Sequence, residues 1–290
     1  MREPSVRASR LAIAGGVAAI ILVGGIGFVL GRNTARPDTP PPTPVATPTP
    51  AASPEPVLLP VLDRTGLIDI ADRAADAFSS GEPMPRRVAE AADRRFDIAL
   101  PFGCAGASGE NSRQPFQWRY DESEATLRVR VEPSRWLPQA WNLSAETSAD
   151  LIEGFWVTRP WSSAETCPPA SSHAVATGAE PVTLPGQTLA VAQFFRDGEA
   201  REARPFELVR RIEPDEFDPS SGYRVRLTGR IGRVPGNGPV QCVQPAGIEQ
   251  RPICVVAVSI NDIRLENSAT GEVLATWDQR VRPNANAAQQ

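Results

Sequence analysis

A run of apolar residues near the N-terminus constrains this chain more than any other feature. Leu11–Leu30 contains no charged side chain and follows Arg2, Arg7 and Arg10. About twenty helical residues, at roughly 1.5 Å each, match the roughly 30 Å hydrocarbon core of a bilayer, whereas a cleavable signal peptide has an apolar core of about 7–15 residues. The sequence therefore predicts a transmembrane anchor over residues 11–31, which is the expected contact of the chain with a membrane.

The charges and cysteines around this anchor predict its orientation. Three arginines precede the apolar run and only Arg32 and Arg36 follow it closely, so the positive-inside rule favours a cytoplasmic segment over residues 1–10. Every basic residue of the chain is arginine, as is typical of a bacterial genome of high GC content. The cysteines are even in number and lie beyond the anchor, which fits an oxidising compartment. We expect a single-pass protein of the bacterial inner membrane with its C-terminal domain in the periplasm.

Residues 32–60 form a proline-rich segment, with ten prolines between Pro37 and Pro60. Such a segment buries too little apolar surface to fold and favours extended polyproline II, at about 3.1 Å per residue. The sequence predicts a disordered linker with a reach of roughly 70 Å, although a PxxP ligand is an alternative. The order of anchor, proline-rich linker and C-terminal domain is similar to that of energy-transducing TonB-type proteins and of several wall-associated envelope proteins, in organisation alone.

The hydrophobic pattern predicts a mainly β (α+β) domain over residues 61–281. Leu67, Ile70, Ala74 and Phe78 recur at steps of three and four residues, which indicates a helix that Thr65 caps and Gly81 ends. A second short helix is expected over residues 85–94, with proline at its first position.

Beyond these helices, apolar and polar residues alternate as they do in half-buried strands, most clearly in Leu127–Glu132. Many short strands separated by Gly, Pro and Asn favour an antiparallel β-sandwich or barrel-like domain. Residues 282–290 are expected to be a disordered tail. The predicted strands are 127–132, 155–158, 188–195, 206–212, 223–228, 254–260, 263–266 and 273–277.

The four cysteines allow three disulfide pairings. Cys242 and Cys254 flank a short loop, which favours a bridge between them and leaves Cys104 to pair with Cys167. A zinc site is not favoured because no CxxC spacing is present. We expect no metal and no cofactor.

Residues able to carry out catalysis are few. His173 is the single histidine, no GxSxG motif surrounds a serine, and the acidic stretch 213–218 lacks EF-hand spacing. The formal net charge of −4 argues against a nucleic-acid partner. The chain is therefore predicted to be a binding or assembly module and not an enzyme, with a membrane-tethered hydrolase that uses unrecognised carboxylates as an alternative.

Two groups of residues are candidates for binding. Trp136 and Trp141 flank a predicted loop, and exposed indoles there would stack on sugar rings, so that the partner would be a cell-wall glycan. Arg224, Arg226 and Arg230 would share one strand face and meet a carboxylate or phosphate of a partner such as another envelope protein. A core position for the tryptophans and a solvated face for the arginines are the alternatives. The oligomeric state stays open.

Overall fold

Two β-sheets and a few helices make up the part of the chain that the computed structural model describes, residues 59–143, 149–168, 187–196, 204–218 and 222–279. This part is mainly β and is consistent with a β-sandwich, as the sequence predicts. The predicted anchor, most of the linker, His173 and the C-terminal tail lie outside the described residues. Among the helices within those residues, none has the length and apolar character required to span a bilayer.

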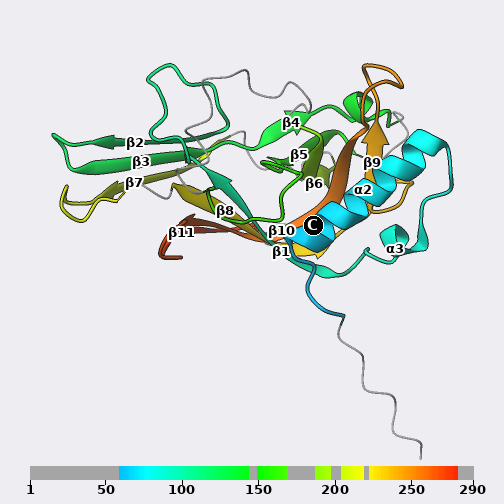
Figure 1. Cartoon of the computed structure of the whole chain (residues 1–290), viewed down its shortest axis with the longest axis horizontal. Helices are drawn as coiled ribbons and strands as arrows, with labels where there is room; N and C mark the ends of the chain where they lie inside the picture. Colours follow the sequence, from blue (N-terminus) through cyan, green and yellow to red (C-terminus); the bar gives the residue numbers. More distant parts are fainter. Residues whose placement is uncertain (1–58, 144–148, 169–186, 197–203, 219–221, 280–290) are drawn as a thin grey trace, which may run out of the picture. The chain divides into compact units, whose positions relative to one another are not determined.

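The larger sheet has eight strands in the order β1-β8-β10-β6-β5-β4, and β9 and β11 also pair with β10 (Figure 1). Its pairs are antiparallel except for β6 with β10, which is parallel and departs from the predicted antiparallel sheet. Between β6 and β10 the chain forms β7 of the other sheet and then β8 and β9, so the parallel pair joins strands that are not consecutive in the chain. The strands are β1 (Arg95–Phe102), β4 (Ser134–Trp136), β5 (Leu151–Trp156), β6 (Leu189–Phe195), β8 (Tyr223–Ile231), β9 (Val240–Val243), β10 (Ile253–Asn267) and β11 (Val273–Asp278).

Strand β10 is the central strand of this sheet. Its first part pairs with β6 and β9, and its second part pairs with β8 and β11. The ladder with β8 shifts register between Ile260 and Asp262. This irregularity interrupts the alternation of apolar residues, which explains why the sequence predicts two strands, 254–260 and 263–266, where the structure has one.

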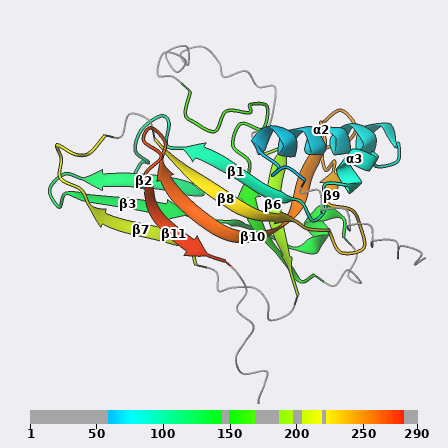
Figure 2. The same ribbon diagram turned by 90° about the horizontal axis from the view of Figure 1, so that it is seen from below.

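The smaller sheet consists of β2 (Phe116–Asp121), β3 (Thr126–Val131) and β7 (Phe206–Arg211), all antiparallel in the order β2-β3-β7. Its inner face is apolar and packs on the main core, with Trp118 beside Tyr223 of β8 at 5.6 Å between ring centroids. Figures 1 and 2 show this sheet at the opposite end of the domain from helix α2 (Arg64–Ser80).

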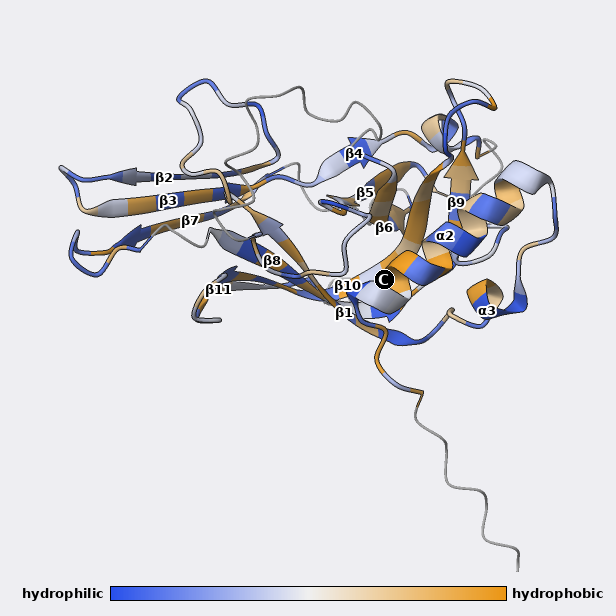
Figure 3. Cartoon of the chain, in the orientation of Figure 1, coloured by the Kyte–Doolittle hydropathy of each residue, from blue (hydrophilic) through white to orange (hydrophobic). Residues whose placement is uncertain are grey.

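Helix α2 forms where the sequence predicts a helix, but its cap differs. The Asp63 side chain, and not Thr65, accepts a hydrogen bond from the Gly66 N–H at 2.8 Å. Gly81 ends the helix as predicted, with the φ of 70° that glycine tolerates. Figure 3 shows hydrophobic and hydrophilic residues on different sides of α2, and the former face the sheet. The second helix, α3, covers only Arg86–Ala89, because the chain turns away after one turn.

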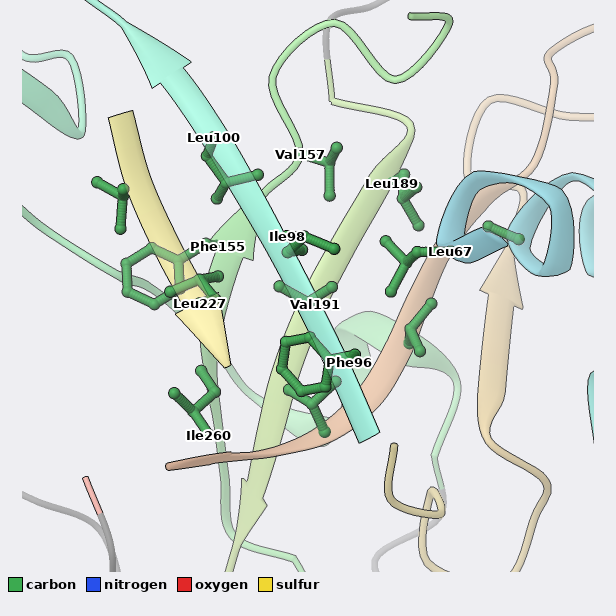
Figure 4. Close-up of a cluster of buried hydrophobic side chains, with 14 of the residues drawn as sticks. Leu67, Phe96, Ile98, Leu100, Phe155, Val157, Leu189, Val191, Leu227 and Ile260 are labelled. Carbon is green, nitrogen blue, oxygen red and sulfur yellow. The ribbon is translucent and has the colours of Figure 1, made fainter. Parts of the chain in front are cut away.

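The main core lies between α2, the large sheet and the inner face of the small sheet. Figure 4 shows side chains from the helix and from several strands meeting there, among them Leu67 of α2, Ile98 of β1, Val191 of β6 and Ile260 of β10. A second apolar cluster covers the opposite face of β10, β6 and β5. The α2 end of the domain therefore has three layers, and the other end has two. We call the second cluster the Trp141 cluster; its buried members are Trp141, Leu143, Ile152, Ala190, Ala192, Val234, Val243, Val255 and Ala257.

The outer edge of β1 is capped by other parts of the chain. The Leu62 N–H donates to Arg95 O at 2.8 Å, and Leu62 O accepts from the Asp97 N–H. At Ala99, the carbonyl accepts from Arg64 Nη1 and the N–H donates to Glu165 Oε1, both at 3.0 Å. Backbone groups along this edge are thus satisfied without another strand.

Candidate functional site

The structure contains the two disulfides that the sequence predicts, Cys104–Cys167 and Cys242–Cys254, and none of the four cysteines is free. Cys242 and Cys254 face each other across the β9–β10 pair. Cys104 follows β1, and Cys167 lies in the segment that follows β5. Each bridge therefore fixes a segment that also borders the cavity described below.

Trp136 and Trp141 do not form the exposed surface that the sequence predicts. Trp141 is 2% exposed, at the end of a 3₁₀-helix over Pro138–Trp141, and Trp136 is half-buried on β4. Their ring centroids lie 5.8 Å apart, and Trp136 lies 5.2 Å from Trp156. The predicted loop is instead a helical turn that folds over the sheet, where Ile152 and Val255 belong to the same cluster as Trp141. The prediction that Trp141 is exposed is wrong.

Arg224, Arg226 and Arg230 do share one face of β8, because buried and accessible residues alternate along the whole strand. Two of these arginines pair with carboxylates within the domain. Glu266 of β10 accepts hydrogen bonds from Arg224 Nε at 2.6 Å and from Arg226 Nε at 2.9 Å, and Asp97 accepts one from Arg226 Nη1 at 2.7 Å.

The surroundings of Arg226 keep it charged. Burial acts to lower its pKa, but the hydrogen bond and charge of Asp97 and those of Glu266 raise the pKa above its usual value. The Glu266 side chain is only 6% exposed, so the network is largely shielded from solvent. Arg230 is exposed and donates to Asp93 O at 3.2 Å. A binding role for the three arginines stays a prediction.

A cavity of about 280 Å³ lies between α2, the loop after β5 and the first residues of β6 and β10. Buried apolar residues line its floor, including Ala71 and Ala75 of α2, Leu189 and the Cys254 end of a disulfide. Trp161 forms part of its wall and is 59% exposed. Trp161 is the most exposed tryptophan of the described residues.

An ion pair lies at the same cavity. Arg251 Nη2, just before β10, is 2.6 Å from Asp72 Oδ1 of α2, and both residues line the cavity. Both side chains are accessible to solvent. The cavity therefore combines an apolar floor, an accessible indole, and a carboxylate with a guanidinium at one place.

A buried arginine holds the loop that carries Trp161. Arg64 is 1% exposed, and its guanidinium donates to the carbonyl oxygens of Thr158, of Arg159 at 3.1 Å and of Ser162 at 2.9 Å. Burial, and secondarily the charge of Arg159, lowers the pKa of Arg64 to about 10, against the opposing charge of Glu165. The group is still charged at neutral pH. Its donors fix backbone on both sides of Trp161.

Trp161 belongs to the same tryptophan-rich section of the sequence as Trp136 and Trp141, but the sequence does not favour it as the exposed one. Its local signal was its position between Pro160 and two serines, a composition typical of a surface loop. The pairing of Asp72 with Arg251 could not be predicted from any local pattern, because 179 residues separate them along the chain.

A second hollow, of about 270 Å³, lies over the outer face of the small sheet. Arg128 and Arg130 line it, but Arg128 pairs with Glu124 at 3.0 Å and Arg130 with Glu132 at 2.8 Å. Across the described ranges, no three His, Cys, Asp or Glu residues lie close enough to hold a metal ion. The acidic stretch 213–218 lies within these ranges. No known protein family matches the chain, and no similar curated protein or solved structure was found.

Proposed function

We propose that this chain is a single-pass protein of the bacterial envelope, with a periplasmic binding or assembly module on a proline-rich linker. The apolar run 11–31 supports the membrane attachment, because its length suits a bilayer. The two disulfides support the compartment, since such bridges persist where the surroundings are oxidising. The linker 32–60 would carry the module away from the membrane surface.

The observation that carries the binding role is the accessible indole of Trp161 beside a cavity. A tryptophan side chain left 59% exposed forgoes much of the hydrophobic stabilisation that burial provides, and the loop that presents it is fixed by Arg64. Concave sites with apolar walls and a few polar groups are the usual form of ligand sites. The module is thus proposed to bind its partner at this end of the domain.

The compartment and the membrane attachment can be tested in cells that make the full chain. We expect a maleimide-polyethylene glycol reagent to add to the denatured protein only after reduction, because all four thiols are in disulfides. A Cys104→Ala variant leaves Cys167 free and is the positive control for labelling without reductant. We also expect external protease to remove the domain from spheroplasts while residues 1–31 stay with the membrane fraction. Thiols that react without reductant in the unaltered chain, or a domain that resists protease until the inner membrane is lysed, would contradict the proposal.

A further inference from the structure

We infer that the cavity beside Trp161 binds a saccharide ring, which stacks on the indole while its hydroxyl groups meet Asp72 and Arg251. This inference names the ligand class of the proposed binding module, and it rests on that proposal only for the source of the saccharide, the cell-wall glycan. Trp161, Asp72 and Arg251 all line the same space, and they come from three separate segments that the fold brings together.

The chemistry of the cavity fits a sugar better than it fits an ion. The carboxylate of Asp72 accepts hydrogen bonds and the guanidinium of Arg251 donates them, so a hydroxyl group finds either partner. Their 2.6 Å contact also balances their charges, so that neither a phosphate nor an ammonium group meets an uncompensated partner. A neutral ligand rich in hydroxyl groups is the class that this pair favours.

The indole of Trp161 and the apolar floor of the cavity also suit a sugar ring. A sugar ring has a flat side of C–H groups, which packs on an aromatic face, and buried Ala71, Ala75 and Leu189 offer it further apolar surface. A volume of about 280 Å³ is at the small end for ligand sites, which suits one ring of a longer glycan better than a large ligand held whole.

The cavity is held in shape before any ligand arrives. Arg64 binds carbonyl groups on both sides of Trp161. Six residues further on, Cys167 ties the same segment to Cys104, and Cys254 ties the opposite wall to β9. A site that is already ordered loses less conformational entropy on binding. This arrangement distinguishes Trp161 from a tryptophan on a loop that must order itself around a ligand.

The test uses the purified full chain in detergent and three saccharide probes: peptidoglycan sacculi in a co-sedimentation assay, and chitotetraose and maltotetraose in a titration followed by tryptophan fluorescence. We expect at least one probe to bind, and Trp161→Ala to weaken that binding about tenfold or more, equivalent to about 1.4 kcal/mol. Trp161→Phe, which keeps an aromatic face, should bind more tightly than Trp161→Ala.

Matched variants separate a site from a general loss of structure. Trp136→Phe alters a half-buried tryptophan of the Trp141 cluster and should leave binding unchanged, whereas Asp72→Asn should weaken it without changing the melting temperature appreciably. Binding of sacculi or chitotetraose would identify a wall glycan as the source, and binding of maltotetraose alone would identify another glucan. Failure of all three probes to bind at millimolar concentration, or equal binding by Trp161→Ala, would overturn the inference. Because this assay needs no cells, its failure would leave the outcome of the thiol and protease tests unaffected.

Discussion

The two halves of β10 differ in the number of layers that cover them. From Cys254 to Val258 every side chain is buried, since α2 covers one face of the strand and the Trp141 cluster covers the other. From Ser259 onward, one face still packs on the main core, but the other carries the charged network around Glu266. Figure 3 shows the first half of β10, beside β9, as hydrophobic.

This difference explains how one strand can show two sequence patterns. A strand covered on both faces is apolar throughout, whereas a strand covered on one face alternates. Ala257 and Ser259 point to the same face of β10, two residues apart, yet Ala257 is buried and Ser259 is exposed. The third layer therefore ends between these two residues.

The largest expected change in stability comes from placing a charge on the buried side of this boundary, with the same change on the exposed side as its control. Ala257→Asp puts a carboxylate among apolar side chains without a partner, and we expect a loss of about 4 kcal/mol or more in the free energy of unfolding. Ser259→Asp should change it by no more than about 0.5 kcal/mol. Urea unfolding of the full chain in detergent measures both, and similar losses for the two variants would show that the proposed boundary is misplaced.

Removal of the disulfides should give the next largest loss in the free energy of unfolding. Cys242–Cys254 lies at the first half of β10, and Cys104–Cys167 lies towards the other end of the domain. Cys104–Cys167 spans 63 residues and Cys242–Cys254 spans 12, so the longer loop restricts the unfolded chain more. We expect replacement of the first pair by alanine to cost about 4 kcal/mol and replacement of the second about 3 kcal/mol. The same unfolding assay compares the two double variants. A larger loss for the Cys242–Cys254 pair would mean that the packing lost at these two buried side chains outweighs chain entropy.

The charged face of the second half should be sensitive to loss of its shielded anion. Glu266→Gln leaves Arg224 and Arg226 side by side without the carboxylate between them, and we expect a loss of about 3 kcal/mol. The matched change Glu124→Gln breaks an exposed pair with Arg128, so its effect should be too small to measure. If Glu266→Gln also left the free energy of unfolding unchanged, Arg224 and Arg226 would form a solvated surface and not a shielded network. Added salt should reduce the effect of Glu266→Gln only slightly, because the group is shielded from solvent.

The same layering accounts for how far the sequence predicts the fold. The strand around Val129 and the strand around Val225 were predicted correctly, because each has one buried and one polar face. Strand β1 was missed, since Ile98–Phe102 are buried without alternation. The parallel pairing of β6 with β10 depends on the path of the chain between them, which no local pattern reports.

The site was harder to predict than the fold for a related reason. Trp141 and Trp161 both occur near prolines, so their local sequences look alike. Trp141 is buried by residues distant in sequence, whereas Trp161 stays exposed. The role of Arg64 in holding the Trp161 loop is equally hidden, since the carbonyl groups that it binds in that loop lie more than 90 residues away. The disulfide pairing was predictable because the short spacing of Cys242 and Cys254 limited the choices, and it is confirmed.

The capped edge of β1 has a consequence for crowded surroundings. An open strand edge recruits strands from other molecules, which leads to aggregation or domain swapping when many copies lie close together. Here Leu62, Arg64 and Glu165 already occupy the backbone groups that a foreign strand would need. In the proposed membrane-anchored form, copies would reach high local densities, and this side of the sheet offers no open edge to a neighbouring copy.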